Sequence, residues 1–323
     1  MKIIAGIDIG GTKCAISFAQ LQDGEITFLD KVRWETDVKS FDNTMEAFIS
    51  NIQNKLDEHA DWELAAIGVS CGGPLDPEKG LIMAPPNLPY WDGVDVYTPL
   101  TEKFGVPVAM RNDADACALA EWKLGAGKGS RNMIFLTFGT GIGAGLILNG
   151  ALYTGSTGLA GEVGHMRLEN DGPLGYGKYG SFEGFCSGGG IANLGRMKAK
   201  EAIAAGNPPM FCKDESEIEN ISTKDIADAM AQGDKLAKEI FDTVGSYLGR
   251  GISLLVDVLN PEVIVIGSIY VRQQEALDPK MYEMLAQEAL PLSRKACRIV
   301  PAGLGEKIGD YAAVTVGMIA MEQ

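Results

Sequence analysis

The chain has 323 residues, of which 46% are hydrophobic and 22% are charged, so it is long enough for about two globular domains. Its net charge of −15, from 28 basic and 43 acidic residues, disfavours binding to nucleic acid and to anionic membranes. No apolar run approaches the length that spans a bilayer, and the start resembles a short strand broken by glycines more than a signal peptide. The six cysteines are scattered without a C-x-x-C pair, which favours reduced thiols, so we expect a cytoplasmic protein.

Residues 2–19, KIIAGIDIGGTKCAISFA, form the first predicted element. An apolar run, a turn of glycine and threonine and a second apolar run indicate a β-hairpin. A turn without Cβ atoms lets backbone N–H groups approach an anion closely. Asp8 stands just before this turn, where it either holds a hydrated Mg²⁺ beside phosphates or bonds the N–H groups of the turn.

Strand and helix patterns alternate after the hairpin, which predicts an α/β layer with a mixed sheet. Residues 31–38 favour a third strand, and residues 41–58 have apolar side chains at helical spacing, with Asp42 or Asn43 as the cap. Residues 64–76 predict a strand that runs into a glycine turn. The next loop, residues 85–93, carries Asn87, either on the sugar side of a site or in a loop that prolines make rigid.

A polar corner follows in residues 111–116, RNDADA, between a strand that ends near Met110 and a helix. Polar residues at the carboxyl end of a strand lie at the edge of the sheet where ligands bind in α/β folds. Asn112 and Asp113 are therefore candidates for the chemistry. Either residue would also serve as the helix N-cap, and the two roles are compatible.

Residues 132–149, NMIFLTFGTGIGAGLILN, repeat the hairpin pattern. The repeat predicts an ancient duplication with a cleft between the halves, and two turns that form two walls of one phosphate site. Each turn is followed by a strand, so neither a P-loop nor a dinucleotide-binding turn, both of which lead into a helix, fits. The alternative is that each turn is only a tight hairpin. The candidate phosphate-binding residues are Gly10, Gly11, Thr12, Lys13, Gly139, Thr140 and Gly141.

Two glycine-rich stretches come next, residues 158–169 and 175–190. The first holds Glu162 and His165, and the second holds Glu183 among aromatic residues. Carboxylates and imidazole in glycine loops with nearby aromatic rings suit a polyhydroxylated sugar. His165 also has a purely structural reading.

The last elements are helices around one buried strand. Residues 222–232 predict a helix with Ser222 and Asp225 as a capping box, and a long helix runs from Asp234 to Asn260. Residues 263–267 predict a buried strand that ends in glycine, and the tail predicts a small-residue helix. We expect a smaller domain of residues 1–115 with 306–323 and a larger domain of residues 116–305.

With these residues assembled, the chain resembles the repressor, open-reading-frame and kinase (ROK) family of the hexokinase/actin/Hsp70 superfamily. DIGGTK and FGTGIGAGLI resemble its two phosphate motifs, RNDADA its catalytic motif, GEVGH its sugar motif and NPEVIVIGS its adenosine-binding turn. The resemblance implies the actin-like ATPase fold, ATP with Mg²⁺ near Asp8, and a homodimer. It further implies Asp113 as catalytic base and Gly267 at the nucleotide, with the sugar held by Asn87, Asn112, Glu162, His165 and Glu183.

One departure from the family concerns zinc. Members usually carry three cysteines that bind a structural zinc with the histidine, and alignment on Glu183 places Leu174, Tyr176 and Ser181 at those positions. None of these provides a thiolate, so we predict no zinc site. The loop must then be held by packing, for which Tyr176, Tyr179, Phe182 and Phe185 are candidates.

The resemblance implies an ATP-dependent kinase that transfers the γ-phosphate to a hexose hydroxyl, such as the 6-OH of glucose or a close relative. A kinase for an N-acetylhexosamine or fructose, and a catalytically silent sugar sensor, are the alternatives. A sugar-responsive repressor fits less well, because the first phosphate motif begins at residue 6 and the chain is acidic.

Overall fold

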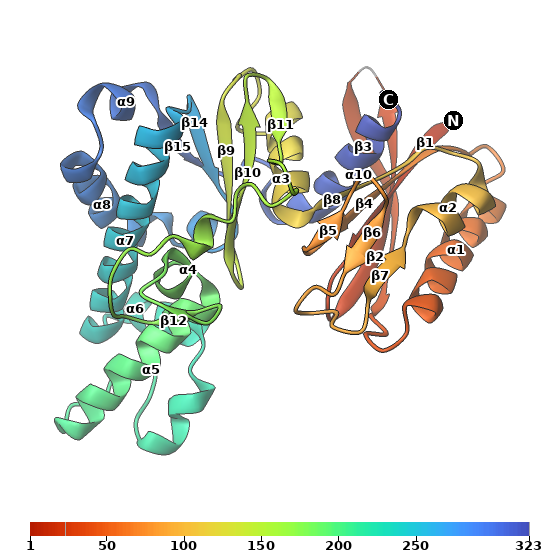
Figure 1. Cartoon of the computed structure of the whole chain (residues 1–323). Helices are drawn as coiled ribbons and strands as arrows, with labels where there is room; N and C mark the ends of the chain where they lie inside the picture. Colours follow the sequence, from red (N-terminus) through yellow and green to blue (C-terminus); the bar gives the residue numbers. More distant parts are fainter. Residues whose placement is uncertain (23, 323) are drawn as a thin grey trace. The chain divides into compact units, whose positions relative to one another are not determined.

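The computed structural model describes residues 1–22 and 24–322 (Figure 1). Residues 23 and 323, which fall within the expected domain ranges, lie outside the described residues. The chain forms two compact units: unit 1 comprises Met1–Gly125, Leu152–Ala160 and Glu306–Gln323, and unit 2 comprises Ala126–Ala151 and Gly161–Gly305.

The expected domain boundary between residues 115 and 116 stays a prediction. In the structure, helix α3 (Asp113–Lys123) lies in unit 1 along its whole length. The reason is that α3 packs against α10 (Ile308–Ala320), the helix of the tail.

Unit 1 is built on a five-stranded sheet of order β3-β2-β1-β4-β8. The first two strands form the antiparallel hairpin expected from the sequence, and β4 and β8 run parallel to β1. The elements of this unit are β1 (Lys2–Ile9), β2 (Lys13–Gln22), β3 (Glu25–Glu35), α1 (Phe41–Glu58), β4 (Glu63–Cys71), β5 (Leu75–Asp76), β6 (Leu81–Met83), β7 (Asp92–Asp95), α2 (Tyr97–Phe104), β8 (Val108–Asn112), α3 and α10.

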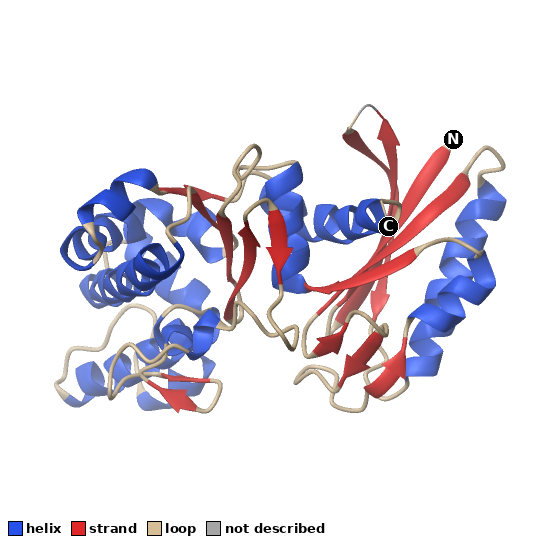
Figure 2. Cartoon of the chain, turned by 45° about the horizontal axis from the view of Figure 1, so that its top comes forward, coloured by secondary structure: helices blue, strands red, loops and turns tan. Residues whose placement is uncertain are grey.

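The two faces of this sheet are covered by different helices, and the alternation of β1 decides which residue meets which helix. Ile3, Ile7 and their neighbours on that face belong to the core that also includes Phe48 of α1. Ile4 packs instead with Val314 of α10. Figure 2 shows these helices in blue beside the strands in red.

Glycines let α10 lie directly on its face of the sheet. A Cβ on Gly6 would come within 2.7 Å of the backbone nitrogen of Val314. A Cβ on Gly68 of β4 would come within 2.1 Å of the carbonyl oxygen of Ala313. The same alternation places Asp8 on the α10 face, at the carboxyl end of β1.

Unit 2 has a sheet of order β11-β10-β9-β14-β15. It repeats the order of the first sheet, and four of its strands repeat the directions, since β9 and β10 form an antiparallel hairpin while β14 is parallel to both β9 and β15. This is the duplicated α/β architecture expected for the actin-like ATPase fold. The strands of this sheet are β9 (Met133–Phe138), β10 (Ile142–Leu148), β11 (Ala151–Tyr153), β14 (Val263–Ile266) and β15 (Arg298–Pro301). In β11, Leu152 and Tyr153 are grouped with unit 1.

The remaining elements of unit 2 are helices and one small hairpin. They are η1 (Val163–His165), β12 (Leu174–Gly175), β13 (Lys178–Tyr179), α4 (Phe182–Phe185), α5 (Gly188–Ala204), η2 (Glu215–Asn220), α6 (Thr223–Ala231), α7 (Lys235–Leu259), α8 (Ile269–Glu288) and α9 (Pro291–Ala296). Three residues from Gly305 to Lys307 form η3 ahead of α10.

The helix ends of the structure can be compared with the caps that the sequence predicts. The capping box of Ser222 and Asp225 is present, and the long helix runs between Asp234 and Asn260 as caps. The cap expected at Asp42 or Asn43 is wrong: Ser40 is the N-cap of α1, and its hydroxyl accepts a hydrogen bond from the Asn43 nitrogen. Within residues 1–22 and 24–322, no helix is both long enough and apolar enough to cross a membrane.

Candidate active site

The first glycine turn is closed by its own backbone and by a neighbouring strand end. The Gly10 nitrogen donates to the Lys13 carbonyl at 3.1 Å, and the Thr36 hydroxyl donates to the Gly10 carbonyl at 2.6 Å. The loop that carries Asn87 packs against this turn, because a Cβ added to Gly11 would lie 2.6 Å from the Asn87 Cβ. Asn87 and the turn therefore lie together, as a shared site requires.

Asp8 experiences an unusual electrostatic environment. Its pKa is raised from 3.8 to about 6, first by burial and then by the negative charge of Asp310, with a smaller contribution from Asp113. Lys31 opposes the shift. Asp310, in the first turn of α10, accepts hydrogen bonds from the Ser17 hydroxyl at 2.7 Å and from the Lys31 ammonium at 2.5 Å.

The polar corner combines both roles considered for it. Asn112 ends β8 and caps α3: its Oδ1 accepts from the Asp115 nitrogen at 2.7 Å, and its Nδ2 donates to Asp115 Oδ2 at 2.9 Å. Asp113 begins α3, remains accessible to solvent, and accepts a hydrogen bond from the Ala114 nitrogen at 2.8 Å. Burial of its carboxyl among protein atoms nevertheless raises the pKa of Asp113, and the Ala114 N–H opposes that shift.

The second glycine turn meets a helix N-terminus within unit 2. The Gly188 nitrogen, at the start of α5, donates to the Gly139 carbonyl at 2.7 Å, and the Gly139 nitrogen donates to the Gly141 carbonyl at 3.1 Å. A Cβ on Gly139 would lie 3.6 Å from the hydroxyl of Ser268, which follows Gly267 at the end of β14. The candidate nucleotide residues of unit 2 thus converge, and α5 adds N–H donors and a positive helix end.

Glu183 joins the sugar-side residues to the second turn. Its Oε2 accepts a hydrogen bond from the Ile142 nitrogen at 3.3 Å, and its carbonyl accepts one from the Ser187 hydroxyl at 2.7 Å. A Cβ on Gly164, between Glu162 and His165, would lie 3.4 Å from the Glu183 Cβ. The two sugar-side stretches of the sequence therefore pack together.

The loop is held by Ser181, which stands at one of the three aligned cysteine positions, and by Lys178 nearby. The Ser181 hydroxyl accepts a hydrogen bond from the Gly184 nitrogen at 3.1 Å and donates one to the Lys178 carbonyl at 3.2 Å. The Lys178 ammonium donates to the His165 carbonyl at 2.7 Å. The edge of the Tyr176 ring meets the His165 ring at 5.1 Å between centroids.

The packing predicted for this loop is partly wrong. Phe182 and Phe185 are buried as expected, and Phe185 stacks on Tyr247 at 3.5 Å between centroids. Tyr176 and Tyr179 are 67% and 60% exposed, so they do not anchor the loop in the core. The reason is local, because both lie in the short β12–β13 hairpin, where Tyr176 has a positive φ of 41°.

The expected absence of zinc stays a prediction. Among residues 1–22 and 24–322, no group of three or more His, Cys, Asp or Glu side chains is arranged to hold a metal ion. The prediction of no zinc site rests on the sequence, because the three aligned positions hold leucine, tyrosine and serine in place of thiolates.

Three site features escaped the sequence analysis. Asp310 comes close to Asp8 only because α10 packs on β1. The N-terminus of α5 gave a signal in the run Ser187–Gly190, a hydroxyl cap followed by glycines. Lys178 gave none, since a lysine in a polar loop is ordinarily a solvated side chain.

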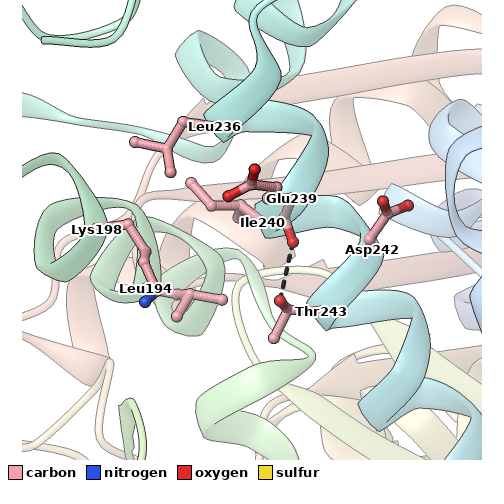
Figure 3. Close-up of a pocket in the computed structure, with 7 residues that line it drawn as sticks. All are labelled: Leu194, Lys198, Leu236, Glu239, Ile240, Asp242 and Thr243. Carbon is pink, nitrogen blue, oxygen red and sulfur yellow. Dashed lines mark hydrogen bonds between the residues drawn. The ribbon is translucent and has the colours of Figure 1, made fainter. Parts of the chain in front are cut away.

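A cavity of about 330 Å³ lies between α5 and α7 (Figure 3). None of the candidate site residues lines it. Its polar groups are engaged locally, as where the Thr243 hydroxyl donates to the Glu239 carbonyl at 2.8 Å. We assign it no role.

Known proteins resemble the chain along most of its length. The family model described as the ROK family matches residues 4–320. A glucokinase of Thermotoga maritima is 32% identical over 98% of this chain and 97% of its own. A ROK family glucokinase from Streptomyces griseus, solved in complex with glucose and AMPPNP, is 26% identical with a TM-score of 0.76, covering 98% of this chain and 99% of its own. A DNA-binding transcriptional dual regulator of Escherichia coli (strain K12) is 30% identical over 86% of this chain and 65% of its own.

Proposed function

Because the chain belongs to the ROK family, we propose that it is an ATP-dependent kinase that phosphorylates a hydroxyl of a hexose such as glucose. The similarity to glucokinases supports a sugar kinase, and the complex of the Streptomyces griseus relative with glucose and AMPPNP supports a nucleotide as phosphoryl donor.

One observation carries the assignment of the base. Asp113 is accessible to solvent at the carboxyl end of β8, yet its surroundings raise its pKa. A carboxyl with a raised pKa accepts a proton more readily, which is what a general base requires. Asn112 is fixed beside it by two hydrogen bonds to Asp115 and so presents a rigid group to a sugar hydroxyl.

The nucleotide is assigned to both glycine turns. Gly10, Gly11, Thr12 and Lys13 in unit 1, and Gly139, Thr140, Gly141 and Gly267 in unit 2, supply backbone and side-chain donors for phosphates and nucleoside. Phosphoryl transfer depends chiefly on such positioning and on stabilisation of charge.

Asp8 is the residue that would hold Mg²⁺, through water. A divalent cation suits this position, because the negative charges of Asp310 and Asp113 both raise the pKa of Asp8 and a bound cation would offset them. When bound, Mg²⁺ would neutralise phosphate charge. Without a cation, the ionised form of Asp8 is the disfavoured one.

The sugar is assigned to Asn87, Asn112, Glu162, His165 and Glu183. Their carboxylate, amide and imidazole groups can accept from and donate to neighbouring hydroxyls. The support from the structure is the packing of Glu183 against the GEVGH stretch and of Asn87 against the first turn. A neutral hexose also suits the acidic chain, which disfavours anionic acceptors.

The test is the variant Asp113→Asn in an ADP-release assay with a panel of hexoses. We expect turnover to fall by roughly 10²-fold or more with sugar affinity retained, since a general base contributes on that scale. Near-normal turnover in Asp113→Asn would refute the assignment of the base. Absence of ADP release from the unmodified chain with every sugar would instead favour a silent sensor.

The similarity to the Escherichia coli transcriptional regulator is the specific observation that favours a second candidate function, that of a regulator without catalysis, which in this chain would sense a sugar. The two functions differ in the same assay, because a sensor binds the sugar without turnover. A homodimer remains our expectation for the assembly, and sedimentation of the full chain measures it directly.

A further inference from the structure

Unit 1 contains a cavity that none of the candidate site residues lines. Its volume is about 710 Å³, and it is formed by β5, β6, α2, the edge strand β8 and the segment 152–158. Cavities that take small molecules have volumes of roughly 300–1,000 Å³. The space is therefore large enough for a monosaccharide or disaccharide.

The walls of this cavity are fixed by hydrogen bonds. The Tyr97 hydroxyl donates to the Pro77 carbonyl at 2.7 Å and accepts from the Met110 nitrogen at 2.9 Å. The Arg111 guanidinium donates to the Met110 carbonyl at 2.7 Å. A Cβ on Gly80 would lie 2.3 Å from the Tyr97 ring, so the ring is packed against that turn. A site with walls held in this way loses little conformational entropy on binding.

The lining disfavours anions and offers both donors and acceptors of hydrogen bonds. It presents three carboxylates, one guanidinium and three hydroxyls, from Asp76, Glu78, Asp115, Arg111, Thr154, Ser156 and Thr157. Even with the Asp76 carboxylate paired to the Lys79 ammonium at 2.9 Å, the carboxylates outnumber the guanidinium, and this excess repels a phosphate or a carboxylate ligand. Leu75, Met83 and the Tyr97 ring add apolar surface.

We propose that this cavity binds a neutral saccharide. Adjacent sugar hydroxyls can donate to the carboxylates and accept from the guanidinium, while the C–H face of the ring lies on the apolar wall.

Asp115 connects this cavity to the candidate active site. It is 2% exposed, and it exchanges two hydrogen bonds with Asn112. A saccharide that donates a hydrogen bond to the Asp115 carboxylate alters the strength of the two hydrogen bonds between Asp115 and Asn112. The position of the Asn112 amide changes as a result. The affinities of the cavity and the substrate site are then coupled reciprocally. This coupling rests on the proposed function, whereas binding in the cavity does not.

The experiment is calorimetric titration of the full chain with D-glucose and with maltose, without nucleotide. In Ser156→Trp the indole would occupy the cavity from an exposed loop position, and Ser156→Ala is the matched control. We expect Ser156→Trp to lose one bound saccharide relative to the unmodified chain, with affinity reduced at least ~10-fold, about 1.4 kcal/mol. Ser156→Ala should retain it.

A second pair of variants tests the same proposal in case Ser156→Trp fails to fold. Arg111→Met should lose the same saccharide, and Arg294→Met, at an exposed position of α9, should not. Equal saccharide binding by Ser156→Trp, Arg111→Met and the unmodified chain, including no binding by any of them, would overturn the proposal. Failure of the proposed function is separately visible, as absence of ADP release from the unmodified chain.

Discussion

Replacing Asp8 by asparagine should stabilise unit 1 while it impairs the proposed phosphoryl transfer. Folding raises the pKa of Asp8 from 3.8 to about 6, chiefly through burial and the nearby charge of Asp310. Each pKa unit corresponds to about 1.36 kcal/mol, so an ionised Asp8 costs the folded, metal-free unit about 3 kcal/mol.

The pH dependence of this effect has a definite sign. The folded state binds more protons than the unfolded state between the two pKa values, so the contribution of Asp8 to stability falls as pH rises from about 4 to about 6. Asp8→Asn lacks this loss. Its advantage in the free energy of unfolding should be near zero below pH ~4 and about 3 kcal/mol above pH ~7.

The tryptophans allow unit 1 to be followed on its own. All four of them, Trp34, Trp62, Trp91 and Trp122, lie in unit 1. Urea unfolding in the presence of a chelator, followed by tryptophan fluorescence at several pH values, therefore measures the stability of the unit that contains Asp8.

A control of opposite sign is available in the same unit. The pKa of Asp30 is lowered, mainly by its hydrogen bond with Lys55, so Asp30 stabilises the folded state above its ordinary pKa. Asp30→Asn should therefore be the less stable protein at neutral pH, with the difference shrinking in acid. If Asp8→Asn were no more stable than the unmodified chain at pH 7, the account of its electrostatics would be wrong.

Three further predictions concern the loop and the first turn. Lys178→Met should raise the KM for the sugar about 10-fold, near 1.4 kcal/mol, with kcat unchanged, because the lysine acts only through the His165 carbonyl. Lys178→Arg should restore the original KM. An equal fall in kcat in Lys178→Met would contradict this role. Ser181→Ala should lower the free energy of unfolding by ~1 kcal/mol in thermal denaturation, because it removes the N-cap of α4. Chelator treatment of the unmodified chain should leave its unfolding midpoint unchanged. A midpoint that depends on chelator would indicate a bound metal. Gly11→Ala should weaken nucleotide binding measured by titration, because the added Cβ would collide with Asn87. Gly72→Ala is the control and should not weaken binding, because the space around Gly72 is open. Equal nucleotide affinities of the two variants would count against a nucleotide that depends on this turn.

The hairpins, the corner and the long helix were predictable because their signals are local. Alternating apolar residues and glycine turns specify β1–β2 and β9–β10 without reference to the rest of the chain. The cap of α1 was missed by two or three positions, since Ser40, Asp42 and Asn43 all have side chains that can cap and only the backbone geometry decides among them.

The charge environment of Asp8 was not predictable, because it depends on contacts between distant segments. Ser17 and Asp310 are 293 residues apart in the sequence, yet their side chains form a hydrogen bond. No period or motif in the sequence reports such a pair. The anchoring of the loop by Ser181 and Lys178 was missed for a related reason, since main-chain carbonyl partners leave no trace in residue identity.

The place of α10 in unit 1 has a consequence for biosynthesis. This helix covers the side of the sheet that holds Ile4 and packs against Gly6 and Gly68, yet the ribosome makes it after all of unit 2. A nascent unit 1 must therefore wait with one apolar surface uncovered, while unit 2 can complete its own core earlier. We expect chaperones that recognise exposed apolar strands to engage the first 125 residues during translation, and to release them once the closing helix emerges.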